Sequence, residues 1–149
     1  MLARWAARMN HPLWRKGHNG CGGKAMSVKV IAMLARKPGL SETEFVRYYE
    51  ECHAPLILSI APQIRDYRRN YLQREGAILA SGARMPEFDV ITELRFDDQA
   101  AFDEAMLAFT DPVNAARIAR DEENVFDRSK TMFFVATELG SGGRHGGQD

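Results

Sequence analysis

The apolar and polar positions along four short segments have the patterns of β-strands. Residues 88–96 alternate most clearly, residues 27–36 are apolar on both faces, and residues 130–139 form the last predicted strand. One face of segment 88–96 is apolar and holds Phe88, Val90, Thr92, Leu94 and Phe96. Segment 64–73 also alternates, but neither of its faces is wholly apolar. We therefore expect it to form an edge strand or the wall of a cavity that needs polar groups.

Between these segments the apolar residues change to helical spacing. Ser41 and Glu44 form a capping box. The helix that follows has one apolar stripe, which we expect to be core: Phe45, Tyr48, Tyr49, Cys52 and Leu56. Because Pro55 disfavours helical geometry in the residue before it, this helix should kink or stop right after His53.

Two more helices are predicted between the third and fourth strands. Asp97 or Asp98 can cap the first of them, whose stripe includes Phe102, Ala105, Met106 and Phe109. Asp111 and Pro112 then open the second, because proline is tolerated in a first helical turn.

The order strand, helix, strand, strand, helix pair, strand is βαββαβ. It predicts an α+β, ferredoxin-like domain, in which the helices cover one face of an antiparallel sheet. Several strands are apolar on both faces, so a monomer would expose a large apolar patch. The economical solution is a two-fold homodimer in which the sheets of two copies pack against each other.

Composition divides the 149 residues into one domain, at 27–139, and two ends. Residues 1–26 hold five basic side chains and no acid, which indicates a mis-assigned start or disordered leader, or alternatively a transit peptide. Residues 140–149 are glycine-rich and typical of a flexible tail. The domain has more acids than bases, and no apolar run is long enough to cross a membrane. We therefore expect a cytoplasmic protein with no nucleic acid or membrane partner.

Three motifs resemble the EthD-domain family, which is named for ethyl tert-butyl ether degradation. They are KVIAMLARKPGLSETEFVRYYEECHAPLI, FDVITELRFDD and DEENVFD, and the resemblance covers roughly Val28 to Leu139. It implies a ferredoxin-like subunit that pairs with a twin as a dimeric α+β barrel and encloses a chamber. Relatives in the wider superfamily include cofactor-free monooxygenases, polyketide cyclases and a muconolactone isomerase. The resemblance thus implies a small, mostly hydrophobic carbonyl or aromatic ligand, in a degradative or oxidative pathway.

His53 is the first candidate catalytic residue, because it is the only histidine within the predicted domain. A kink after it could turn the imidazole toward the chamber, where it would act as general acid or base near neutral pH. The resemblance supports this role, since His53 stands where the family motif has its histidine. The alternative is a structural histidine that donates to a free carbonyl at a helix end.

Glu93 is the second candidate, because it is a carboxylate on the mixed face of a strand suited to burial. It could orient His53, or pair with Arg69 or Arg95; a plain ion pair on the strand is the alternative. Tyr67, Arg69 and Tyr71 share one face of segment 64–73 and are candidate substrate-binding residues, with ordinary packing as the alternative.

No cofactor or metal site is expected. His11, His18 and His145 lie outside the predicted domain, and no paired metal-ligand motif or dinucleotide glycine motif occurs. Three hypotheses remain: a cofactor-independent enzyme that uses His53, a non-catalytic ligand-binding accessory protein of an oxidative system, and a purely structural dimer without a cavity. The substrate itself is beyond the sequence.

Overall fold

The computed structural model describes residues 27–138, so the predictions for residues 1–26 and 140–149 lie outside the described part. The elements in chain order are β1 (Val28–Leu34), α3 (Glu42–Tyr48), the π-helical turn η1 (Tyr49–His53), α4 (Ala54–Ile60), β2 (Asp66–Tyr71), β3 (Val90–Phe96), α5 (Gln99–Thr110), α6 (Pro112–Val125), the 3₁₀ turn η2 (Arg128–Lys130) and β4 (Met132–Ala136). This is the βαββαβ order that the sequence predicts.

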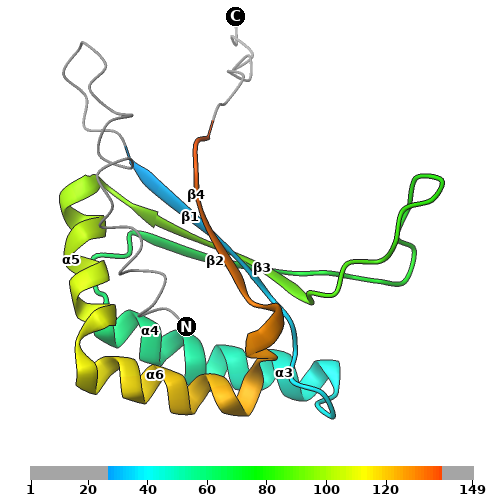
Figure 1. Ribbon diagram of the computed structural model, residues 1–149, viewed down its shortest axis with the longest axis horizontal. Helices are drawn as coiled ribbons and strands as arrows, with labels where there is room; N and C mark the ends of the chain where they lie inside the picture. The colour runs from blue at the N-terminus through cyan, green and yellow to red at the C-terminus, as the bar shows by residue number, and fades with distance from the viewer. Residues whose placement is uncertain (1–26, 139–149) are drawn as a thin grey trace, which may run out of the picture.

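The strands of the described residues form one antiparallel sheet in the order β2-β3-β1-β4. The described helices α3, α4, α5 and α6 lie on the same side of it (Figure 1). Along β1 and β3 buried positions alternate with half-buried ones, and Val30 on β1 stands opposite Leu94 on β3. The core therefore lies between the helices and this inward face, and the predicted α+β, ferredoxin-like architecture is confirmed.

The helices begin at the predicted residues. The Ser41 hydroxyl accepts from the Glu44 backbone amide while the Glu44 side chain accepts from the Ser41 amide, which is a complete capping box. Asp98 caps α5, and Asp111 caps α6 with Pro112 in its first turn. Each cap satisfies backbone amides that a helix end otherwise leaves without a partner.

The first helical segment does not stop after His53, because α4 continues from Ala54. It continues through the π-helical turn η1, in which the Ala54 amide donates to the Tyr49 carbonyl five residues back. This wider turn places the inward-facing side chains four residues apart, at Phe45, Tyr49, His53 and Ile57. It also corrects the predicted stripe, because Cys52 is exposed rather than buried in the core.

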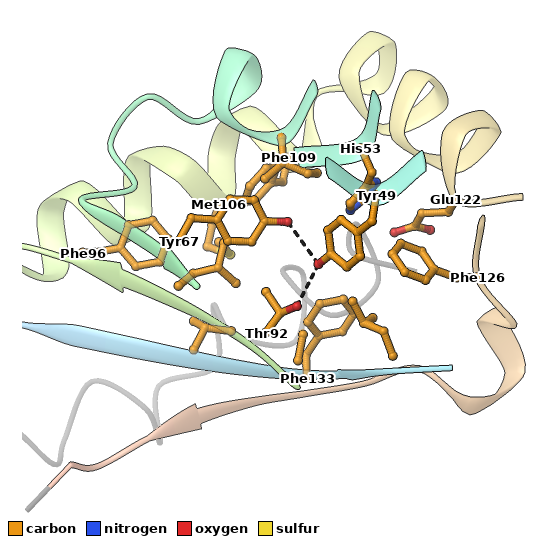
Figure 2. Close-up of a pocket in the computed structure, with 15 residues that line it drawn as sticks. Tyr49, His53, Tyr67, Thr92, Phe96, Met106, Phe109, Glu122, Phe126 and Phe133 are labelled. Carbon is orange, nitrogen blue, oxygen red and sulfur yellow. Dashed lines mark hydrogen bonds between the residues drawn. The ribbon is translucent and has the colours of Figure 1, made fainter. Parts of the chain in front are cut away.

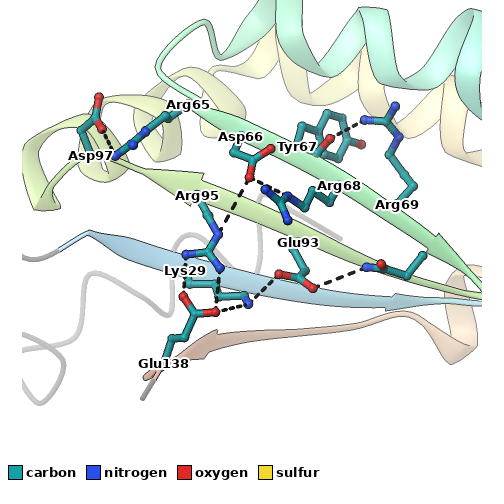
Figure 3. A network of polar contacts seen from close by, with 11 residues as sticks. Lys29, Arg65, Asp66, Tyr67, Arg68, Arg69, Glu93, Arg95, Asp97 and Glu138 are labelled. Carbon is teal, nitrogen blue, oxygen red and sulfur yellow. Dashed lines mark hydrogen bonds and ion pairs between the residues drawn. The ribbon is translucent and has the colours of Figure 1, made fainter. Parts of the chain in front are cut away.

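Among the described residues no helix covers the second face of the sheet, which is called here the open face. It combines half-buried apolar residues with Met132 and Phe134 of β4, which are 43% and 48% exposed. It also carries a charged network that crosses the strands, from Glu138 after β4 to Asp66 on β2 (Figure 3). In this network Lys29 pairs with Glu93 at 2.5 Å, and Arg95 pairs with Glu138 at 2.5 Å. Within residues 27–138, no helix is long and apolar enough to cross a membrane.

Candidate functional site

His53 ends the π-helical turn η1 and is only 4% exposed. Its Nδ1 lies 2.5 Å from Asp121 Oδ2 on α6. The rings of Tyr49 and Phe126 contact the imidazole edge-on, with centroids 5.0 and 4.9 Å away. Among the described residues, Nε2 of His53 has no hydrogen-bond partner. One nitrogen of the imidazole is therefore hydrogen-bonded and two aromatic rings pack against the imidazole, while the second nitrogen remains available.

Asp121 is itself held in place. Tyr48 donates a hydrogen bond to its Oδ1 at 3.1 Å, and His53 occupies its Oδ2. Asn124, one turn further along α6, donates to the Tyr48 hydroxyl at 3.1 Å. Because both oxygens of this carboxylate are used, Asp121 fixes the orientation of the imidazole rather than pointing toward a ligand.

His53 borders a cavity between the inward face of the sheet and the helices (Figure 2). The cavity has about 480 Å³ of space free of protein atoms, including solvent at its mouth. Most of its lining is aliphatic or aromatic; the polar lining residues are Tyr49, His53, Tyr67, Thr92 and Glu122. The prediction of a chamber between two sheets is thus wrong for His53, whose cavity lies within one subunit, on the helix-covered side.

Three hydroxyl groups form a short chain at the wall of the cavity. A hydrogen bond of 2.8 Å joins the hydroxyls of Tyr49 and Thr92, and one of 3.2 Å joins Tyr49 and Tyr67 (Figure 2). Burial raises the pKa of Tyr49 to about 12 and that of Tyr67 well above its usual value, so both phenols keep their protons. Tyr49 is therefore both a core residue, as predicted, and a wall of the cavity.

Of the three predicted substrate-binding residues, the structure brings only Tyr67 to the cavity. Arg69 donates two hydrogen bonds to the Glu50 carboxylate, at 2.9 and 2.6 Å, and its guanidinium lies 4.7 Å from the centroid of the Tyr67 ring. Tyr71 donates to Glu50 at 2.8 Å. The Arg69 guanidinium, followed by the Tyr71 hydroxyl, holds the pKa of Glu50 below its usual value. These hydrogen bonds link β2 to the turn η1 beside the cavity.

Glu93 lies on the open face, and the structure does not bring it to His53. Successive side chains of a strand point to opposite faces, so Thr92 faces the cavity while Glu93 faces away from it. Glu93 pairs with Lys29 at 2.5 Å, and not with Arg69 or Arg95 as the sequence suggested. Its contacts fit the ion pair that was the alternative interpretation.

Asp121 and Glu122 belong to the DEENVFD motif, but neither is among the site residues that the sequence predicts. The stronger signal was the inward stripe of the α6 helix, with positions i, i+3, i+4 and i+7 occupied by Ile118, Asp121, Glu122 and Val125. Two carboxylates in the middle of an otherwise apolar stripe indicate buried acids with a function.

The residues that the structure describes offer little to a metal ion. Within 27–138 no group of three or more His, Cys, Asp and Glu side chains is placed to hold one. The chemistry that the cavity itself presents is proton transfer by imidazole and carboxyl groups, and hydrogen bonding by hydroxyl groups.

The fold and the cavity together define an α+β, ferredoxin-like protein with a small, largely apolar cavity. The model of the EthD domain matches residues 37–129, and the chain therefore belongs to the EthD family. A comparison with curated proteins gave no match.

Solved structures share the fold at low sequence identity. An EthD family protein from Bacillus halodurans C-125 is 22% identical, with 76% of this chain and 100% of that chain covered and a TM-score of 0.51. An EthD-like protein from Ralstonia eutropha JMP134 is also 22% identical, with 75% and 91% covered and a TM-score of 0.53. The hydroxynitrile lyase from Passiflora edulis is 17% identical, with 77% and 97% covered and a TM-score of 0.50.

Proposed function

We propose that this EthD protein is a cofactor-independent enzyme that acts on a small, largely hydrophobic carbonyl or aromatic compound, with His53 as general acid or base. The observation that carries the proposal is the placement of one buried imidazole. It is held by Asp121 on one side and borders an apolar cavity on the other. A buried titratable group in such a cavity, oriented by a second group, is the usual arrangement of an acid–base site.

Asp121 determines which nitrogen of His53 can act. A carboxylate at Nδ1 favours the tautomer in which that nitrogen carries the proton and donates it to Asp121. Nε2 then presents a lone pair, and the neighbouring carboxylate stabilises the imidazolium that forms once Nε2 has accepted a proton. The apolar walls exclude water from this step, which strengthens each polar contact inside the cavity.

The hydroxyl chain supplies the second requirement, a place for the polar atom of the ligand. The hydroxyls of Tyr49, Tyr67 and Thr92 bond one another in the free protein, so one of them can turn to donate to a carbonyl oxygen. The fold also supports catalysis elsewhere, since a protein of similar fold from Passiflora edulis is a hydroxynitrile lyase.

A two-stage experiment tests the proposal. Cyclic ketones, phenols and aryl aldehydes are first screened for those that raise the melting temperature, because a ligand that binds the folded state stabilises it. Compounds that bind are then incubated with the protein, and products are sought by mass spectrometry. We expect conversion by the wild type and none by His53→Asn, which keeps a donor for Asp121 but lacks Nε2.

Cys52→Ala is the matched control, because Cys52 precedes His53 in the same turn but is exposed. It should convert the ligand at the wild-type rate. If the ligands bind and none is converted, the protein is the non-catalytic accessory protein instead. Equal conversion by wild type and His53→Asn would remove His53 from the mechanism.

We also propose that two copies of the chain pair through the open face. The support is its composition: Met132 and Phe134 are large and exposed, and Ile31, Met33 and Ile91 beside them are only half-buried. Apolar surface of this kind on a sheet favours packing against a second sheet. Phe134→Glu should convert a dimer to a monomer in light-scattering measurements of mass, and a wild type that is already monomeric contradicts the pairing.

A further inference from the structure

The inward stripe of α6 brings two consecutive acids to the site. Asp121 pairs with Nδ1 of the His53 imidazole and orients it, but this role does not account for Glu122. Glu122 is 4% exposed and lines the same cavity as His53. Figure 2 shows its carboxylate and the imidazole at the same end of the cavity, next to Phe126.

Among the described residues Glu122 forms one ion pair, in which Arg128 Nε lies 3.2 Å from its Oε2. This nitrogen is not aligned for a hydrogen bond, and within residues 27–138 no hydrogen bond reaches the Glu122 side chain. A buried carboxyl group with one ion pair and no hydrogen bond is costly to keep in an apolar wall. Such a group is retained where it meets a ligand.

We propose that Glu122 is a second catalytic acid–base group, which exchanges a proton with the carbonyl oxygen of the ligand while His53 exchanges one with the adjacent carbon. This inference rests on the proposed function and narrows it to enolisable ketones and aldehydes. Two separate groups are needed because the two protons move at different atoms of the ligand. The cavity offers both groups at one end and apolar walls for the rest of the molecule.

The step balances without a co-reactant. Nε2 of His53 takes the proton from the carbon next to the carbonyl, and the electrons of the broken C–H bond form a carbon–carbon double bond. The carbonyl oxygen accepts a proton from Glu122, which leaves a neutral enol, an imidazolium and a carboxylate. Return of a proton to the same carbon regenerates the ketone, and return to a conjugated carbon gives an isomer.

The charges around Glu122 fit this role. Burial raises the pKa of Glu122, which favours the protonated form that can donate. Arg128 and His53 act in the opposite direction and favour the carboxylate, most strongly once the imidazole is protonated. Glu122 therefore releases its proton most easily when the His53 imidazole becomes protonated.

Hydrogen–deuterium exchange tests the inference without knowledge of the natural substrate. The full-length protein is incubated in D₂O with 1-indanone or 2-cyclohexen-1-one, and loss of the α-proton signals is followed by NMR. We expect the wild type to accelerate exchange over the buffer, and His53→Asn to abolish the acceleration. Glu122→Gln, which keeps shape and hydrogen bonding but cannot transfer a proton, should lower it by about 100-fold or more.

Glu123→Gln is the matched control, since Glu123 is the next residue of the same helix and is exposed. It should exchange the ketones at the wild-type rate. Glu122→Asp, which keeps a transferable proton on a shorter side chain, should recover part of the rate. Circular dichroism confirms that each variant is folded before it is compared.

The outcomes separate this inference from the proposed function. Wild-type exchange by Glu122→Gln together with none by His53→Asn overturns the role of Glu122 and leaves His53 in place. Equal exchange by His53→Asn and the wild type overturns both. If the wild type accelerates exchange of neither ketone, enolisation is overturned, and the ligand screen decides on the remaining acid–base chemistry.

Discussion

Both faces of the sheet carry polar groups but use them differently. On the helix-covered side Tyr49, His53 and Thr92 are buried around a cavity. There the Tyr49 hydroxyl is hydrogen-bonded to that of Thr92, and His53 is hydrogen-bonded to Asp121. On the open face Lys29 and Glu93 belong to a network of charges that solvent reaches. Residue 92 and residue 93 are adjacent in the chain and yet belong to different kinds of environment.

The environment of a polar group, rather than its residue type, therefore determines whether it can take part in chemistry. A charge that solvent and counter-charges stabilise has no reason to give up or accept a proton near neutral pH. A group in an apolar cavity lacks this stabilisation and can therefore exchange a proton more readily. The predictions below test this difference between the faces, starting with the largest expected effect.

The stability of the subunit should depend on aromatic residues of the helix-covered face. Phe45 is fully buried, so Phe45→Ala should lower the free energy of unfolding by about 3–5 kcal/mol. Phe134→Ala on the open face should cost a monomer less than about 1 kcal/mol. Urea denaturation at protein concentrations low enough to keep the chains monomeric measures both, and similar costs would erase the distinction.

The buried tyrosines should make the protein sensitive to alkali. Burial raises the pKa of Tyr49 from 10.0 to about 12, so its contribution to stability is complete below pH 10 and is lost as the pH rises to 12. The loss amounts to about 3 kcal/mol for a shift of this size. Tyr49→Phe should flatten the fall in stability between these pH values by that amount.

Absorbance at 295 nm provides an independent readout of the same effect. The pKa of each of the four tyrosines is raised, with burial as the largest cause. Their ionisation should therefore coincide with alkaline unfolding measured by circular dichroism. Titration of all four near pH 10 in a folded protein would show that these side chains are open to solvent.

The coupling energies of one ion pair on each face should differ. A double-mutant cycle with alanine at His53 and Asp121 should give about 1.5–3 kcal/mol, the range for a buried hydrogen bond to a charged group. The corresponding cycle for Lys29 and Glu93 should give less than about 1 kcal/mol. Equal coupling energies would mean that the two pairs share one environment.

The smallest effect should come from Glu138, at the exposed edge of the charged network. Hydrogen bonds from Arg95 and then Lys29 lower its pKa from 4.5 to about 2. Its contribution to stability is present above pH 4.5 and is lost as the pH falls toward 2. Glu138→Gln should therefore cause a small loss of stability at neutral pH that high salt removes, and none below pH 2.

Much of the fold could be predicted from the sequence because its signals are local. The alternation in β1 and β3, the Ser41 capping box and the Asp98 cap depend on residues a few positions apart, and all are present. The position of Cys52 could not be predicted in this way. It follows from the π-helical turn, which shifts the inward face of the helix by one residue.

The candidate site was harder to predict because its partners are distant in the chain. His53 and Asp121 are 68 residues apart, and only the packing of η1 against α6 brings them together. Glu93 is a charge among apolar residues on the mixed face of β3, but the sequence does not indicate whether one face of the sheet or both are covered. The helices cover only the face of Val90, Thr92 and Leu94, so Glu93 lies opposite them.

The position of a bound ligand tests the central claim most directly, since the claim places the chemistry on the helix-covered face. The measurement is a crystal structure with a compound from the thermal screen. The account predicts ligand density inside the cavity, with its polar atom within hydrogen-bond distance of His53 Nε2. A ligand bound instead on the open face, against Glu93 and Arg95, would contradict it.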